Sequence, residues 1–66
     1  MNLPPVDSTW KHHNGNLYRV VMHTNTESDR AEYPTTIVYT NVVNGTNWSR
    51  ATTEWSRSFT QVILED

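Results

Sequence analysis

The residues best suited to chemistry form one tripeptide that occurs twice, as Trp48-Ser49-Arg50 and as Trp55-Ser56-Arg57. Tryptophan stacks on flat rings, and arginine offers a planar fork of N–H donors to phosphates and carboxylates. This pair of residue types therefore suits a planar, anionic or nucleotide-like ligand. The same pair also closes small β cores, where the indole fills the interior and the arginine stem covers it. The first interpretation predicts a binding protein and the second only a stable fold.

Size and composition limit the classes of protein that the chain can belong to. It has 66 residues, a formal net charge of −2 and no cysteine. One domain of this length buries only about 60% of its unfolded surface, so an aromatic core and a homodimer are expected to supply stability. Without cysteine there are no disulfides and no thiolate metal sites. Five Lys and Arg residues against seven Asp and Glu residues disfavour binding to polymeric nucleic acid.

The first residues carry neither a basic region nor an apolar run. We therefore expect no signal peptide, no membrane span and a cytoplasmic location. Pro4-Pro5 is incompatible with helix or central strand, which predicts an extended leader over residues 1–8. A single β domain over residues 9–66 is expected to follow it.

Two Asn-Gly pairs, Asn14-Gly15 and Asn44-Gly45, predict β-hairpins, because Asn-Gly suits the two-residue type I′ turn. Thr52 or Thr53 is expected to cap one helical turn that runs through Trp55. The expected strands are Thr9–His13, Asn16–Thr24, Thr35–Val43, Thr46–Ala51 and Thr60–Leu64. Short, evenly spaced strands predict an all-β fold, either a small five-stranded SH3-like barrel or a rolled antiparallel sheet with one short helical turn.

Two-residue turns also fix which residues face each other. In the first hairpin, His12 would face Leu17 and Trp10 would face Arg19. One face would then carry Trp10, His12, Leu17, Arg19, Val21 and His23, and the other Lys11, His13, Tyr18, Val20 and Met22.

In the second hairpin, Asn41 would face Trp48 and Tyr39 would face Arg50. One face would carry Ile37, Tyr39, Asn41, Trp48 and Arg50. This face predicts a stacking wall with a forked donor beside it, or else a core in which Arg50 lies along the Tyr39 ring. Of the two tripeptides, the first lies on a strand and the second in a turn, where Trp55 is the better candidate to fill the core.

The chain resembles a family of short bacterial and phage proteins of unassigned function. The shared signature is aromatic-x-His-x-x-Gly-x-x-Tyr, then Val-Tyr, then Trp-x-Arg and a further aromatic residue. Here it reads as residues 10–18, Val38-Tyr39 and Trp48-Ser49-Arg50, with Trp55 or Phe59 as the last aromatic. Ala51 stands where that family has proline. The resemblance spans about residues 9–63 and implies a small β-barrel-like fold with a recurrent set of His12, Tyr39, Trp48 and Arg50.

The resemblance implies no enzyme activity, and phage proteins of this size often act by binding a host protein or a host nucleotide signal. A metal site is not expected, because only His12 and His23 would share a face and zinc requires three or four ligands. Pairing Ser49 or Glu54 with a histidine would give a hydrolytic site, but no motif supports it.

We therefore expect a non-catalytic binding protein without a cofactor, located in the host cytoplasm if it is phage-encoded. It would sequester a nucleotide-like or anionic planar molecule, for instance a host defence signal. The expected ligand-binding residues are Trp48, Tyr39 and Trp55 for stacking, Arg50 and Arg57 for the charged group, and His12 and Asn41 for polar contacts. The alternative is a protein–protein interaction module that docks and inhibits a host protein through its aromatic face. A weak contact with nucleic acid through exposed aromatics is a third interpretation, which the acidic charge disfavours.

Overall fold

Five strands form one antiparallel sheet with the order β4-β3-β2-β1-β5, in a computed structural model that describes residues 3–63. A single turn of helix, α1, lies between β4 and β5 in the chain. The elements are β1 (Thr9–His12), β2 (Leu17–Thr24), β3 (Thr36–Asn41), β4 (Asn47–Ala51), α1 (Thr52–Trp55) and β5 (Phe59–Val62). The all-β prediction with one helical turn is confirmed.

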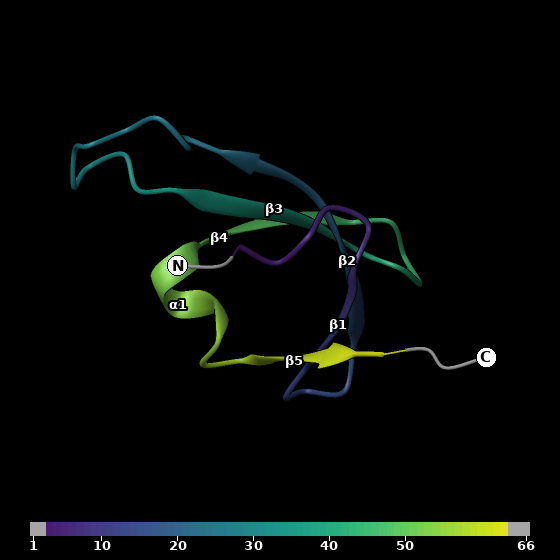
Figure 1. Cartoon of the computed structure of the whole chain (residues 1–66). Helices are drawn as coiled ribbons and strands as arrows, with labels where there is room; N and C mark the ends of the chain where they lie inside the picture. The colour runs from purple at the N-terminus through teal and green to yellow at the C-terminus, as the bar shows by residue number, and fades with distance from the viewer. Residues whose placement is uncertain (1–2, 64–66) are drawn as a thin grey trace.

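The sheet is curled, so that its two edge strands lie on opposite sides of a shared concave face (Figure 1). A register shift between Val20 and Met22 leaves Val21 without a partner in β3, and such bulges bend a strand and increase its twist. Within the described residues the ladder ends at β4 and at β5, which are not paired with each other. The fold is therefore the open, rolled sheet and not the closed barrel.

The pairing within the first hairpin differs from the prediction by one residue. Trp10 pairs with Tyr18 and Lys11 with Leu17, and the amide of His12 donates to the Asn16 carbonyl at 2.9 Å. The loop thus has three residues with Gly15 at a φ of 95°, a geometry that glycine adopts without strain. A shift of one residue changes the parity of the faces, so the predicted faces of this hairpin were wrong. Tyr18 shares the inner face with Trp10.

The second hairpin differs from the prediction by two residues. Tyr39 pairs with Trp48 and Ile37 pairs with Arg50, so the predicted pairs Asn41–Trp48 and Tyr39–Arg50 were wrong. The loop has four residues and ends at Gly45 with a φ of 73°. A shift of two residues preserves the parity, so Ile37, Tyr39, Asn41, Trp48 and Arg50 share one face as predicted. Ile37 and Tyr39 on this face belong to the core.

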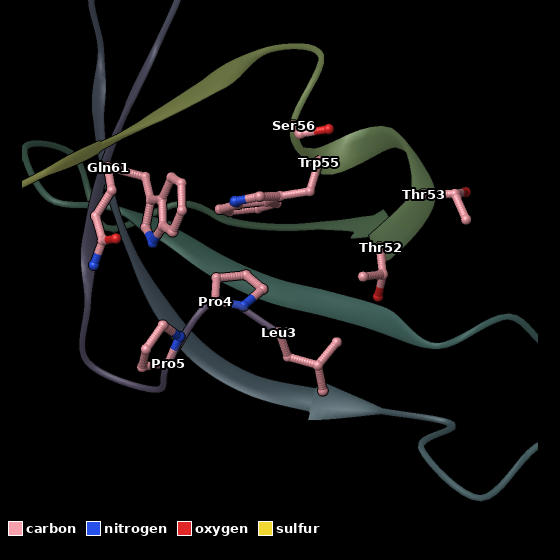
Figure 2. Close-up of a pocket in the computed structure, with 9 residues that line it drawn as sticks. Leu3, Pro4, Pro5, Thr52, Thr53, Trp55, Ser56 and Gln61 are labelled. Atoms are coloured by element: carbon pink, nitrogen blue, oxygen red, sulfur yellow. The ribbon is translucent and has the colours of Figure 1, made fainter. Parts of the chain in front are cut away.

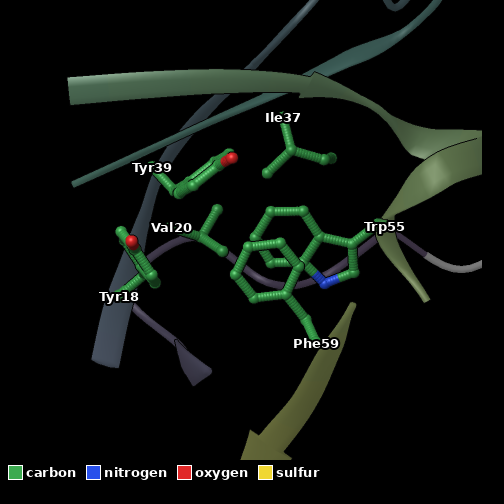
Figure 3. Packing of buried hydrophobic residues seen from close by; sticks show 6 residues of the cluster. All are labelled: Tyr18, Val20, Ile37, Tyr39, Trp55 and Phe59. Atoms are coloured by element: carbon green, nitrogen blue, oxygen red, sulfur yellow. The ribbon is translucent and has the colours of Figure 1, made fainter. Parts of the chain in front are cut away.

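An aromatic cluster fills the concave face of the sheet (Figure 3). The Trp55 and Phe59 rings stack in parallel with centroids 4.0 Å apart. Tyr39 meets both rings edge-to-face, at 5.0 and 5.2 Å, and Tyr18 meets Phe59 at 5.7 Å. The buried core consists of these four rings with Val20 and Ile37. A 66-residue chain thus gains a core from large aromatic side chains in place of many aliphatic ones.

The leader, described from residue 3, packs on the core. Leu3 contacts the aromatic cluster, Pro4 is buried, and Nε2 of His23 lies 2.6 Å from the Pro4 carbonyl oxygen. Asp7 has a φ of 72°, and its amide donates to the Val20 carbonyl at 2.8 Å. The bulge at Val21 allows this arrangement, because it brings His23 onto the inner face opposite Ile37.

The start of α1 corrects one expectation. The residue at the N-cap is Ala51, and no side chain caps the turn. The Thr52 hydroxyl instead donates to the Thr35 carbonyl at 2.9 Å, which fastens α1 to the start of β3. The closing strand β5 begins at Phe59, one residue before its predicted start, and the predicted end at Leu64 lies outside the described residues. In residues 3–63, no helix has the length and apolar character needed to cross a membrane.

Candidate functional site

The two Trp-Ser-Arg tripeptides have opposite environments. Trp55 is buried at 4% exposure under the other rings of the core, while Trp48 on the edge strand β4 is 53% exposed. The Trp48 indole donates to the Thr46 hydroxyl at 2.9 Å, which holds the ring in place. The prediction that Trp55 fills the core is confirmed. Trp48 alone of these two residues offers an open ring surface for stacking.

Arg50 reaches from β4 across the concave face to β5. Its guanidinium carbon lies 5.3 Å from the centroid of the Phe59 ring, within the range of a cation–π contact. The His12 ring meets Phe59 from β1, with centroids 4.9 Å apart. Phe59 on the edge strand β5 thus contacts both a guanidinium from the opposite edge strand, β4, and an imidazole from β1. We call these three residues the Arg50 site.

Tyr39 lies in the core beneath the Arg50 site, where its ring contacts Phe59. It is 5% exposed, so its ring faces are covered by the core and cannot stack a ligand as predicted. Burial raises the pKa of the Tyr39 phenol, while the charge of Arg50 and a hydrogen bond from it act in the opposite direction. The Arg50 guanidinium therefore lies near the Tyr39 phenol and over the Phe59 ring.

His12 presents a defined nitrogen to the Arg50 site. The backbone N–H of Asn14 donates to Nδ1 of His12 at 3.1 Å, so neutral His12 carries its proton on Nε2. Burial lowers the pKa of His12, and the positive charges of His13 and Arg50 lower it further, whereas the side chain of Asn14 raises it. Near neutral pH the site thus contains one fixed cation and one neutral N–H donor.

We expect the His12 titration midpoint, followed by the NMR signal of its ring Cε1–H, to lie below 6.5. The unfolded chain then binds the proton more readily than the folded chain. Neutral His12 therefore leaves the protein fully stable above pH 6.5. The free energy of unfolding decreases as the pH falls from 6.5 through the lowered pKa of the folded state. Arg50→Gln should move the midpoint part of the way back, because burial remains. A midpoint at or above 6.5 in the unaltered protein would contradict the arrangement.

Asn41 has a structural task. It is 7% exposed, and its Oδ1 accepts hydrogen bonds from the amides of Val43 and Asn44 at 2.8 and 3.2 Å. The side chain therefore organises the four-residue loop between β3 and β4. The structure places it away from the polar ligand contact that was predicted for it.

A surface groove, which we call the basic groove, adjoins the Arg50 site. It has a volume of about 230 Å³ and includes His12 and Phe59. Lys11, His13 and Arg57 add cationic or titratable groups to its lining. Arg57 is exposed, and its guanidinium forms an ion pair with Glu54 at 3.1 Å. Arg57 lines this groove together with Phe59, and Arg50 contacts the same ring.

Sequence reasoning did not assign Phe59, Lys11 or His13 to a site. Phe59 enters the sequence analysis only as a candidate for the last aromatic of the family signature, and Lys11 and His13 only as members of one hairpin face. The decisive fact is the pairing of β1 with β5, which sets His12 opposite Phe59 and Lys11 opposite Thr60. That pairing joins the first and the last strand, which are far apart in the sequence, and no local pattern encodes it.

No three His, Asp or Glu side chains in residues 3–63 are grouped as metal ligands would be. The fold and site define a small rolled β domain with a cationic and aromatic end. Comparisons with protein-family models, with curated proteins and with solved structures found no match to the chain.

Proposed function

We propose that the protein is a non-catalytic binding protein for an anionic, planar small molecule of the nucleotide type. The observation that carries this proposal is the Arg50 guanidinium, fixed against Phe59 and beside the His12 ring. The two ion pairs found in residues 3–63 join Arg30 to Glu32 and Arg57 to Glu54, so neither of them uses Arg50. A fixed guanidinium outside those pairs is suited to an external anion.

The charge distribution supports the same proposal. Lys11, Arg50 and Arg57 are three of the five Lys and Arg residues, and all three border the Phe59 end of the fold. Glu54 is the acidic residue that forms an ion pair there. The basic groove, at about 230 Å³, is smaller than the roughly 300–1,000 Å³ of a typical small-molecule pocket. The basic groove therefore suits one anionic group of the ligand. The planar part of the ligand would lie outside the groove, and Trp48 is the exposed aromatic ring on the same face of the sheet.

The hydrogen bonds of two histidines favour sequestration over turnover. His12 contacts the Asn14 amide, and His23 contacts the Pro4 carbonyl. Neither of these contacts pairs a histidine with a hydroxyl nucleophile, which is the arrangement of an activated serine or threonine. We infer that the protein withholds its ligand, for instance a host defence signal in the host cytoplasm, and does not convert it.

A thermal-shift screen at low ionic strength tests this function. Cyclic dinucleotides, ADP-ribose, mononucleotides and inorganic pyrophosphate are the probes. We expect a nucleotide to raise the melting temperature by several degrees, since a ligand at 100 times its Kd adds about 2.7 kcal/mol of stability. Recovery of the unchanged nucleotide after incubation would support sequestration. No shift with any of these probes would overturn the proposal.

Trp48 favours one second candidate, a protein–protein interaction module that docks a host protein. This ring is 53% exposed on an edge strand, and Val42 and Val43 are 47% and 88% exposed in the loop before it. Exposed aromatics of this kind anchor many interfaces. A host protein captured by the unaltered chain but not by Trp48→Ala, with no response to nucleotides, would favour this candidate. The expected homodimer is a further proposal, which sedimentation at several concentrations tests.

A further inference from the structure

A groove of about 810 Å³ lies between the leader, α1 and the Trp10 side of the sheet (Figure 2). Leader residues 3–5 form one wall, and the Trp10 and Trp55 indoles form another. Thr53 and Gln61 are exposed at its rim. The described residues that line the groove carry no charge, in contrast to the basic groove. Its volume falls within the range of small-molecule sites.

Trp55 gives this groove a chemical preference. Its Nε1 is buried and has no hydrogen-bond partner, and it is the one buried side-chain nitrogen or oxygen in residues 3–63 that lacks one. The Trp10 indole, in contrast, donates to the Ser8 hydroxyl at 2.8 Å. A buried donor without a partner costs about 1–3 kcal/mol, which an acceptor on a ligand would recover. Figure 2 shows the Trp55 ring extending from α1 into the groove, with its nitrogen on the side away from the helix.

We propose that this groove binds a neutral, planar heteroaromatic ring that carries a hydrogen-bond acceptor. The two indoles, 5.6 Å apart and nearly perpendicular, offer one ring face and one ring edge to such a ligand. The acceptor pairs with Nε1 of Trp55. The absence of charge among the described lining residues selects against ions. This proposal therefore does not depend on the proposed anion site, although Ser56 borders both grooves.

The leader is the wall that yields when the ligand enters. Nε1 of Trp55 is shielded from solvent, so an acceptor reaches it only after a lining segment shifts. The other walls belong to the sheet, to α1 and to Ser56 directly after it, whereas residues 3–5 belong to no strand or helix. The contact of His23 with the Pro4 carbonyl limits this movement, because it ties the leader to β2.

A matched pair of probes tests the site. Indole and 7-azaindole have the same shape, and only 7-azaindole carries a ring nitrogen acceptor. In ¹⁵N-labelled protein at pH 7.5, we expect 7-azaindole to move the indole N–H signal of Trp55 downfield and to bind about tenfold more tightly than indole. The indole signal of Trp48 should stay in place, and pyrophosphate should not compete.

Two substitutions of exposed threonines provide the matched control. Thr53→Phe places a ring in this groove and should reduce 7-azaindole binding at least tenfold. Thr60→Phe makes the same change beside the basic groove and should leave binding unaltered. Equal affinity for the two probes, or an unmoved Trp55 signal, would overturn the proposal and would mean that the Trp55 N–H rests against the Trp10 ring. An effect of Thr60→Phe equal to that of Thr53→Phe would overturn it as well.

Discussion

Trp55→Ala is expected to abolish the folded state, while Trp48→Ala is expected to leave it nearly as stable as the unaltered protein. Removing a buried tryptophan costs about 3–5 kcal/mol, and a core in a chain this small rarely supplies more than about 3–5 kcal/mol. Trp55 is 4% exposed, stacks on Phe59 and meets Tyr39 and Trp10 edge-to-face. Trp48 is 53% exposed, so its loss should cost less than about 1 kcal/mol.

Urea denaturation followed by circular dichroism measures both effects. Because Trp55→Ala leaves no folded state to titrate, Trp55→Phe serves as the quantitative variant. It keeps a ring for the stack on Phe59 and should lower the midpoint without abolishing the transition. A larger loss of stability for Trp48→Ala than for Trp55→Phe would contradict the core described above.

Hairpin positions could be predicted from the sequence, whereas hairpin register could not. Asn-Gly marked both turns correctly, because each glycine occupies a left-handed position. The type I′ turn also requires a positive φ at asparagine, and neither Asn14 nor Asn44 has one. The loops are longer as a result, by one residue in the first hairpin and by two in the second. The odd shift reversed the predicted faces, and the even shift preserved them.

The candidate site was predictable to the extent that it depends on one hairpin. Trp48 and Arg50 share one face of β4 as predicted, since parity was preserved there. Phe59 and the basic groove depend on β5 pairing with β1, a contact between distant parts of the chain. The burial of Tyr39 also depends on the pairing of β5 with β1. This pairing brings Trp55 and Phe59, which follow β4 in the chain, over the Tyr39 ring.

Arg50→Gln should reduce binding of the nucleotide found in the screen about 100-fold while the protein stays folded. Removing one partner of a hydrogen-bonded charge pair costs about 2–5 kcal/mol of binding free energy. The loss to the fold is smaller, because the cation–π contact of the half-buried Arg50 is worth about 0.5–2 kcal/mol. Isothermal titration calorimetry measures the first effect, and urea denaturation measures the second.

Graded variants separate the geometry of Arg50 from its charge. Arg50→Lys keeps the charge but loses the fork of donors, so it should recover only part of the affinity. Arg57→Gln should weaken binding about threefold, because its guanidinium is exposed, screened by water and shared with Glu54. Arg30→Gln removes a cation that pairs with Glu32 in the loop between β2 and β3, and should change nothing. Equal losses of affinity for Arg30→Gln and Arg50→Gln would show that binding depends only on the net charge of the protein. The Arg50 site would then have no role in binding.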